Sequence, residues 1–230
     1  MHLFTASGLL AGFMGLLAVE RGDYRAAMLW MLLTLVIDGI DGTFARAARV
    51  KEVLPNVNGT TIDYVIDFFT YAILPAYFFY RGLPVGDETL RLTGAFLMLL
   101  SAALYYGKEG MVSADGKHFV GFPVLWNMVV FVQIFVFTDW PAWAHLAFVV
   151  ILTVLHFVPV YFVYPSRGGR WWPLTIANTV VFILAVAVNA WYYPDWEGTW
   201  AAIWRGVVYV TVGYYVLLAV LDTPRGQVNN

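Results

Sequence analysis

Four aspartates stand in or beside apolar segments of the chain, where a charged side chain is costly. Asp38 and Asp41 come at the end of one apolar stretch, and Asp63 and Asp67 come at the start of the next. Residues three or four apart share one face of a helix, so each pair forms a short acidic stripe. Ionisable groups near lipid commonly mark a functional site. The spacing therefore predicts two paired helices that bring four carboxylates together.

Such a cluster of acids indicates a metal site. Four carboxylates in a partly desolvated place cannot all stay ionised without cations. Ligands that offer only oxygen select a hard divalent ion, and the absence of cysteine excludes thiolate ligands. Four carboxylates are enough for two ions, and two-metal sites serve phosphoryl displacement. We expect Asp38, Asp41, Asp63 and Asp67 to bind Mn²⁺ or Mg²⁺, with two ions in the site.

Small residues and one arginine lie in phase with the acids. Gly42 and Ala45 share the first stripe with Arg46 at its edge, and Gly59 begins the second stripe. Glycine lets a ligand approach the backbone closely, and arginine binds phosphate through two parallel hydrogen bonds. This arrangement favours a nucleotide diphosphate lying across the metals. The structural alternative is an interfacial pair of Asp41 with Arg46, with Gly42 as a helix-packing contact.

The composition indicates an integral membrane protein. Of 230 residues, 61% are hydrophobic and only 12% are charged, against roughly 25% charged in soluble domains. Residues 119–138, 140–166 and 171–194 contain no Asp, Glu, Lys or Arg, and apolar runs of this length are typical of membrane-spanning helices. We predict an all-α polytopic protein, a single membrane domain over residues 1–230. Its eight expected spans are about 2–19, 25–48, 60–80, 90–107, 119–138, 141–163, 171–193 and 200–221.

The basic residues predict the orientation. If the amino terminus lies in the cytoplasm, the outer loops hold fewer Lys and Arg residues than the inner loops, as the positive-inside rule requires. All four aspartates then lie on the cytoplasmic side. The chain has no block of like charge, which argues against nucleic acid as a partner. The inner set is Arg46, Arg49, Lys51, Lys108, Lys117, Arg167, Arg170 and Arg225, and the outer set is Arg21, Arg25, Arg81, Arg91 and Arg205.

The acidic pattern resembles the signature of the CDP-alcohol phosphotransferase family, D-x2-D-G-x2-A-R, a spacer, then G-x3-D-x3-D. Every fixed position is matched, from Asp38 to Asp67. The spacer runs over residues 47–58, longer than the usual eight or so, and it is similar to that of the bacterial phosphatidylcholine synthase branch. Three further segments share this similarity: 4–8 (FTASG), 50–55 (VKEVLP) and 121–127 (GFPVLWN).

The resemblance implies a reaction and roles for the residues. Choline would attack CDP-diacylglycerol and release CMP and phosphatidylcholine, at the cytoplasmic face of the bacterial inner (cytoplasmic) membrane. Asp38, Asp41 and Asp63 would ligate the metals, with Asp63 bridging them, and Asp67 would be the general base and also touch a metal. The CDP-diacylglycerol site would comprise Gly42, Ala45, Arg46 and Gly59. Members of the family are often homodimers, so a homodimer is a possible assembly.

Choline itself carries a quaternary ammonium, which aromatic faces and a carboxylate recognise. We expect Tyr105, Glu109 and Trp126 to bind it. Arg167 and Arg170 would bind a lipid phosphate, or serve only as anchors at the cytoplasmic interface. Other aromatic candidates near the expected mouth more often have a packing role; they are Tyr64, Tyr71, Tyr106, Phe119, Phe122 and Tyr161.

Two alternatives to a choline transferase stay open at this stage. A sibling with the same acids could use serine, glycerol phosphate or inositol phosphate, although a phosphorylated acceptor would favour more basic residues than this chain has. A divalent-cation transporter could also use four carboxylates, but transporters commonly bind at the midplane of repeated halves. Here the acids lie near one face, and no internal repeat is visible.

Overall fold

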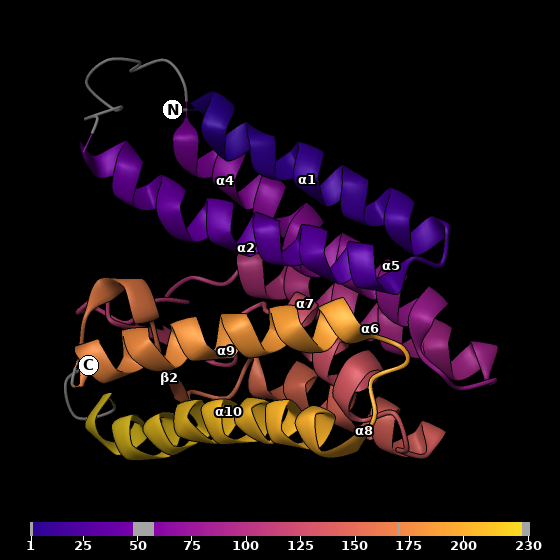
Figure 1. Cartoon of the computed structure of the whole chain (residues 1–230). Helices are drawn as coiled ribbons and strands as arrows, with labels where there is room; N and C mark the ends of the chain where they lie inside the picture. Colours follow the sequence, from indigo (N-terminus) through magenta and orange to yellow (C-terminus); the bar gives the residue numbers. More distant parts are fainter. Residues whose placement is uncertain (1, 48–57, 170, 227–230) are drawn as a thin grey trace.

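The computed structural model describes residues 2–47, 58–169 and 171–226, and the side chains of 4–40, 58–169 and 171–224. The described chain is mostly helical (Figure 1). Its α-helices are α1 (His2–Glu20), α2 (Tyr24–Ala47), α4 (Gly59–Asp67), α5 (Leu74–Gly82), α6 (Glu88–Tyr106), α7 (Trp126–Phe131), α8 (Ala142–Leu155), α9 (Trp172–Tyr192) and α10 (Gly198–Gly226). The other elements are the π-helices η1 (Phe68–Ile73) and η2 (Val132–Val136), the 3₁₀ turn η3 (Pro165–Arg167), and the strands β1 (His118–Val120) and β2 (Tyr161–Val163).

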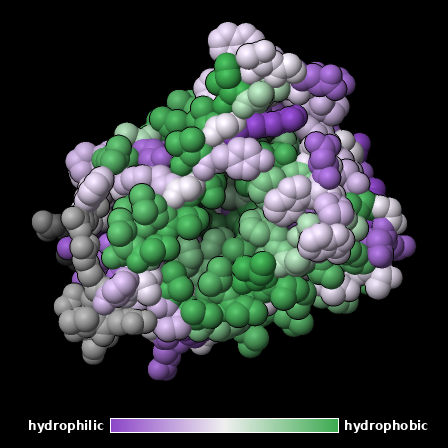
Figure 2. All heavy atoms as spheres, turned by 90° about the horizontal axis from the view of Figure 1, so that it is seen from below, coloured by the Kyte–Doolittle hydropathy of each residue, from purple (hydrophilic) through white to green (hydrophobic). Residues whose placement is uncertain are grey.

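The lengths of the apolar helices are those of a membrane protein. Among the described residues, four stretches are long and apolar enough to cross a bilayer: Gly59–Gly82, Glu88–Tyr106, Trp172–Tyr192 and Gly198–Pro224. Three shorter apolar helices accompany them, Phe4–Glu20, Trp126–Val136 and Ala142–Leu155. The face over α8 and α10 is largely hydrophobic and hollowed at its centre (Figure 2). An apolar surface of this extent is suited to lipid, so the prediction of a helical membrane protein is confirmed.

Two of the expected spans are shorter than the sequence suggested. The expected helix at 119–138 is helical only over 126–136, and the expected helix at 141–163 ends at Leu155. The residues left over form β1 and β2, which pair antiparallel with Phe119 opposite Phe162. Gly121 explains the break, because its φ is +92° and a Cβ there would lie 2.1 Å from the His156 carbonyl oxygen. Hydropathy alone detects neither the turn nor the close approach.

The helices form two groups around a buried centre. In Figure 1, α1, α2 and α4 run together along one side, and α9 and α10 run together along the other. The described core between them contains fully buried large side chains such as Met28, Phe78, Phe79, Trp126 and Phe131. The start of α1 and the end of α10 lie on the same side of the molecule (Figure 1). Close packing of this kind fixes the relative position of α2 and of η1, the segment that directly follows the acids of α4.

A glycine on α1 lets the acid-bearing segment approach closely. A Cβ added at Gly12 would lie 2.9 Å from the Phe69 ring and 3.1 Å from the Thr70 methyl group. Both of these residues belong to η1, which follows directly after Asp67. The position of η1, and with it the end of α4, therefore depends on residue 12 being a glycine, which has no side chain.

Candidate metal centre

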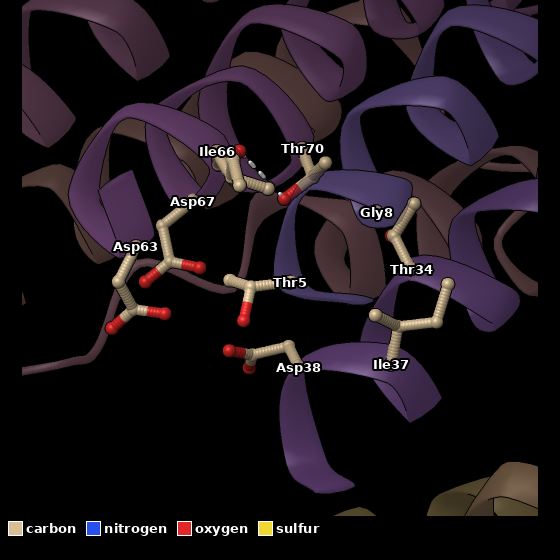
Figure 3. A pocket seen from close by; sticks show the side chains of 9 residues that line it. All are labelled: Thr5, Gly8, Thr34, Ile37, Asp38, Asp63, Ile66, Asp67 and Thr70. Atoms are coloured by element: carbon tan, nitrogen blue, oxygen red, sulfur yellow. Dashed lines mark hydrogen bonds between the residues drawn. The ribbon is translucent and has the colours of Figure 1, made fainter. Parts of the chain in front are cut away.

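Three of the four aspartates meet in the structure. Asp38 lies on α2, and Asp63 and Asp67 lie on α4. One carboxylate oxygen from each lies within 4.8 Å of the other two, and all three side chains are half-buried. Figure 3 shows the three carboxylates converging from two helices on a common space, with Thr5 pointing toward the same space. The convergence expected from the spacing is thus present for these three residues, on two helices that both pack against α1.

The start of α4 is held by a local cap. Asn58 has extended backbone angles, and its Oδ1 accepts a hydrogen bond from the backbone N–H of Thr61 at 3.2 Å. A side chain of this type at the N-cap satisfies an N–H group that the helix leaves free. Gly59 is the first residue of the helix. The cap fixes where α4 begins, so Asp63 and Asp67 fall on the face toward α2.

The helix changes its geometry directly after the acids. Residues Phe68–Ile73 form a π-helix, in which hydrogen bonds span five residues in place of four. Such segments shift the face that a helix presents and are frequent at functional sites. Within this segment lies Tyr71, whose hydroxyl donates a hydrogen bond to Asp38 Oδ2 on α2 at 2.8 Å.

The acids line a pocket between α1, α2 and α4. Polar and apolar side chains share its wall, so the carboxylates are partly shielded from water. The lining residues are Thr5, Gly8, Thr34, Ile37, Asp38, Asp63, Ile66, Asp67 and Thr70 (Figure 3). Like charges this close disfavour one another, and a cation among them removes the penalty. The three acids fit a hard divalent ion, because their ligand atoms are all carboxylate oxygens.

The rest of the acidic signature lies on the last turns of α2. Asp41, Gly42, Ala45 and Arg46 belong to the helix Tyr24–Ala47, but their side chains lie outside the described part of the structure. Their expected roles as metal and nucleotide ligands therefore stay predictions from the sequence. Arg170, one of the two arginines expected at a lipid phosphate, also lies outside the described residues.

The residues expected at choline lie in different surroundings. Tyr105 and Trp126 are buried, at 2% and 0% exposure, whereas Glu109 is exposed. The rings of Tyr105 and Trp126 each lie 5.2 Å from the ring of His156, measured between centroids. Both side chains thus belong to a packed cluster around His156.

Arg167 contacts a tyrosine in the loop after β2. Its guanidinium carbon is 4.7 Å from the centroid of the Tyr164 ring, and that ring stacks on Phe119 at 4.3 Å. Burial raises the pKa of the Tyr164 hydroxyl, Arg167 lowers it, and Asp38 and Asp63 add further increases. Tyr164 is therefore within electrostatic reach of both the arginine and the acids.

Sequence reasoning missed the specific role of Tyr71. It counted Tyr71 only among many aromatic candidates, yet Tyr71 continues the four-residue spacing of Gly59, Asp63 and Asp67. That spacing was the available signal. Thr5 belongs to the segment 4–8, which the sequence analysis uses only as evidence of family similarity. The structure places Thr5 in the pocket wall.

Comparison with known proteins gives a consistent set of relatives. The chain is 41% identical over 189 residues to phosphatidylcholine synthase of Rhizobium johnstonii, covering 82% of this chain and 75% of the relative. It is 38% identical over 216 residues to phosphatidylcholine synthase of Agrobacterium fabrum, covering 94% and 86%. The enzyme of the same name from Pseudomonas aeruginosa is 38% identical over 185 residues, covering 80% and 76%. No protein-family model matches the chain.

Proposed function

We propose, because the chain belongs to the phosphatidylcholine synthase family, that it transfers the phosphatidyl group of CDP-diacylglycerol to choline. The observation that carries this proposal is the convergence of Asp38, Asp63 and Asp67 within 4.8 Å. The oxygen of choline would form a new bond to the phosphatidyl phosphorus, and the bond from that phosphorus to CMP would break. The products are phosphatidylcholine and CMP.

Asp38, Asp63 and Asp67 would hold Mn²⁺ or Mg²⁺, and with Asp41 the set is sufficient for two ions. When bound, such ions neutralise the diphosphate and stabilise the charge that develops on CMP. Tyr71 holds the carboxylate of Asp38 in one orientation through its hydrogen bond. Asp67 would receive the hydroxyl proton of choline, as a general base within reach of the acceptor.

The nucleotide and lipid side would be formed by the end of α2 and the loop after β2. Gly42, Ala45, Arg46 and Gly59 would line the CDP-diacylglycerol site, with Arg46 binding phosphate. Arg167, with Arg170, would bind a lipid phosphate. Arg167 packs on the ring of Tyr164, and burial together with the charges of Asp38 and Asp63 raises the pKa of the Tyr164 hydroxyl. Both observations support this assignment.

Choline contacts at Tyr105, Glu109 and Trp126 stay a proposal from the sequence. The burial of Tyr105 and Trp126 around His156 favours a supporting part for these two rings, behind the surface that a substrate would touch. Glu109 is exposed and carries the negative charge that a cation favours.

For the membrane arrangement we propose eight spans, with the site facing the cytoplasm across a bacterial inner membrane. The four long apolar stretches, the three shorter ones and α2 together give this number. The start of α1 and the end of α10 on one side agree with an even number of crossings (Figure 1), and the bias of basic residues supports a cytoplasmic location for that side. One membrane domain and a homodimer belong to the same proposal.

A direct assay tests the function. Purified protein with CDP-diacylglycerol, MnCl₂ and radiolabelled choline is expected to give labelled phosphatidylcholine and an equal amount of CMP. Asp67→Asn should abolish transfer, whereas Asp195→Asn, in the loop between α9 and α10, should leave it unchanged. Transfer to serine but not to choline would identify a sibling enzyme with another alcohol. Full transfer by Asp67→Asn would show that Asp67 is not the base.

A further inference from the structure

Three aromatic rings meet beside the acidic triad. Tyr64 and Phe68 follow Asp63 and Asp67 by one residue each, so they lie on the neighbouring face of the same helix. The Tyr106 ring lies 5.8 Å from Tyr64 at an interplanar angle of 53°. It lies 6.2 Å from Phe68 at 76°. The rings of Tyr64 and Phe68 are therefore both inclined to the ring of Tyr106 and do not form a stack with it.

This group of rings lies next to the reacting groups. Tyr106 is the last residue of α6, which packs against η1, the segment that directly follows Asp67. The ring of Tyr106 contacts Tyr64 and Phe68, the two residues that directly follow Asp63 and Asp67 in the sequence. Tyr64 is 40% exposed, and Phe68 and Tyr106 are half-buried. The rings are therefore accessible from the surface of the protein, and the carboxylates of Asp63 and Asp67 belong to the residues that directly precede two of them.

The geometry matches the shape of the acceptor. Choline has a two-carbon link between its hydroxyl and its quaternary nitrogen, so the ammonium must lie immediately beside the base that takes the proton. A quaternary nitrogen has no N–H to donate, and it is recognised by aromatic faces, with a gain that grows as the site is desolvated. Aromatic faces therefore favour methylated amines over amines whose N–H groups each need a hydrogen-bond acceptor.

We propose that Tyr64, Phe68 and Tyr106 form an aromatic cup that receives the trimethylammonium group of choline while Asp67 receives its hydroxyl proton. This inference rests on the proposed transfer to choline. Other nearby aromatic rings are already covered by neighbouring side chains or are fully buried. Tyr164 is stacked between Phe119 and Arg167, and Trp126 is fully buried. The cup makes these three residues the determinants of acceptor specificity.

Steady-state kinetics on variants of the purified enzyme tests the cup. Phe68→Leu, Tyr64→Leu and Tyr106→Leu are each expected to raise the KM for choline by about threefold to thirtyfold, the range of one cation–π contact. The KM for CDP-diacylglycerol should stay unchanged, and the preference for choline over N,N-dimethylethanolamine should fall. Tyr64→Phe and Tyr106→Phe keep the rings and should keep that preference. Phe96→Leu, a 54% exposed residue on α6, is the matched control.

A second measurement preserves the shape of the protein. Fluorinated phenylalanines at position 68 remove electron density from the ring but hardly change its size, so the KM for choline should rise stepwise with the number of fluorine atoms. A KM independent of fluorination would overturn the cup. So would leucine variants that raise the KM of both substrates equally, or a loss of choline preference only in Tyr105→Phe and Trp126→Phe. If the wild-type enzyme does not use choline at all, the proposed function fails before the cup is tested.

Discussion

Tyr71 on η1 donates a hydrogen bond to Asp38 on α2, at 2.8 Å between the hydroxyl oxygen and Oδ2. The bond joins the two helices that carry the acids, and it fixes the orientation of one carboxylate in the triad. A hydrogen bond to a charged group contributes about 1.5–3 kcal/mol. Loss of this hydrogen bond should therefore weaken the binding of a metal ion.

We predict that Tyr71→Phe raises the Mn²⁺ concentration for half-maximal activity by about tenfold, because the carboxylate of Asp38 is no longer held in place. Activity at saturating Mn²⁺ should fall less. Titration of activity with MnCl₂ measures both effects. Tyr209→Phe, an exposed tyrosine on α10, is the control. An unchanged Mn²⁺ requirement in Tyr71→Phe would show that the hydrogen bond has no part in metal binding.

Metal removal gives a test that does not depend on activity. An ion that binds only the folded state stabilises it by about 2.7 kcal/mol at a hundred times its dissociation constant. We expect EDTA to lower the Tm of the wild-type protein in detergent, and Mn²⁺ or Mg²⁺ to restore it. Asp38→Asn and Asp63→Asn should lack this metal-dependent shift. A shift of the same size in these variants would place the metal elsewhere.

Much of the site followed from local spacing in the sequence. Asp63 and Asp67 are four residues apart, and helical geometry alone places them on one face. The apolar segments on either side of the spacer predicted that Asp38 would meet them, and the structure brings the three together. The role of Tyr71 could have been found by extending the same stripe by one turn. The π-helix could not, because no residue type marks it reliably.

Long-range contacts account for what the sequence did not reveal. The pairing of β1 with β2 joins residues that are more than forty positions apart, and no periodicity in either segment indicates a partner. Charge-free runs at 119–138 and 140–166 read as continuous spans because hydropathy averages over Gly121 and Pro159. The prediction of the choline-binding rings was limited for the same reason. The expected rings at Tyr105 and Trp126 turned out to be buried, since burial depends on neighbours from several helices.

The close packing of α1 against η1 predicts a sensitive position at Gly12. In Gly12→Val the new side chain would meet Phe69 and Thr70, with the Cβ alone 2.9 Å from the Phe69 ring. Overpacking of this kind costs about 1–3 kcal/mol, and the displaced η1 would move Tyr71 away from Asp38. We expect a lower Tm and a loss of activity greater than the loss of folded protein. Gly213→Val, where a Cβ has nothing within 4 Å, should change neither; equal effects of the two variants would contradict this account.

Gly121 should be the least tolerant glycine among those described. Its φ of +92° disfavours any side chain, and a Cβ would lie 2.1 Å from the His156 carbonyl oxygen, which is backbone and cannot rotate away. Gly110 has a φ of +71° but nothing within 4 Å of a Cβ, so Gly110→Ala bears only the backbone cost of about 1–2 kcal/mol. The comparison separates the two causes. We expect Gly121→Ala to prevent accumulation of folded protein and Gly110→Ala to lower the Tm modestly, both measured by fluorescence-detected size exclusion and thermal unfolding. If the two variants lost the same stability, the contact with His156 would not be what holds the paired strands β1 and β2 against the end of α8.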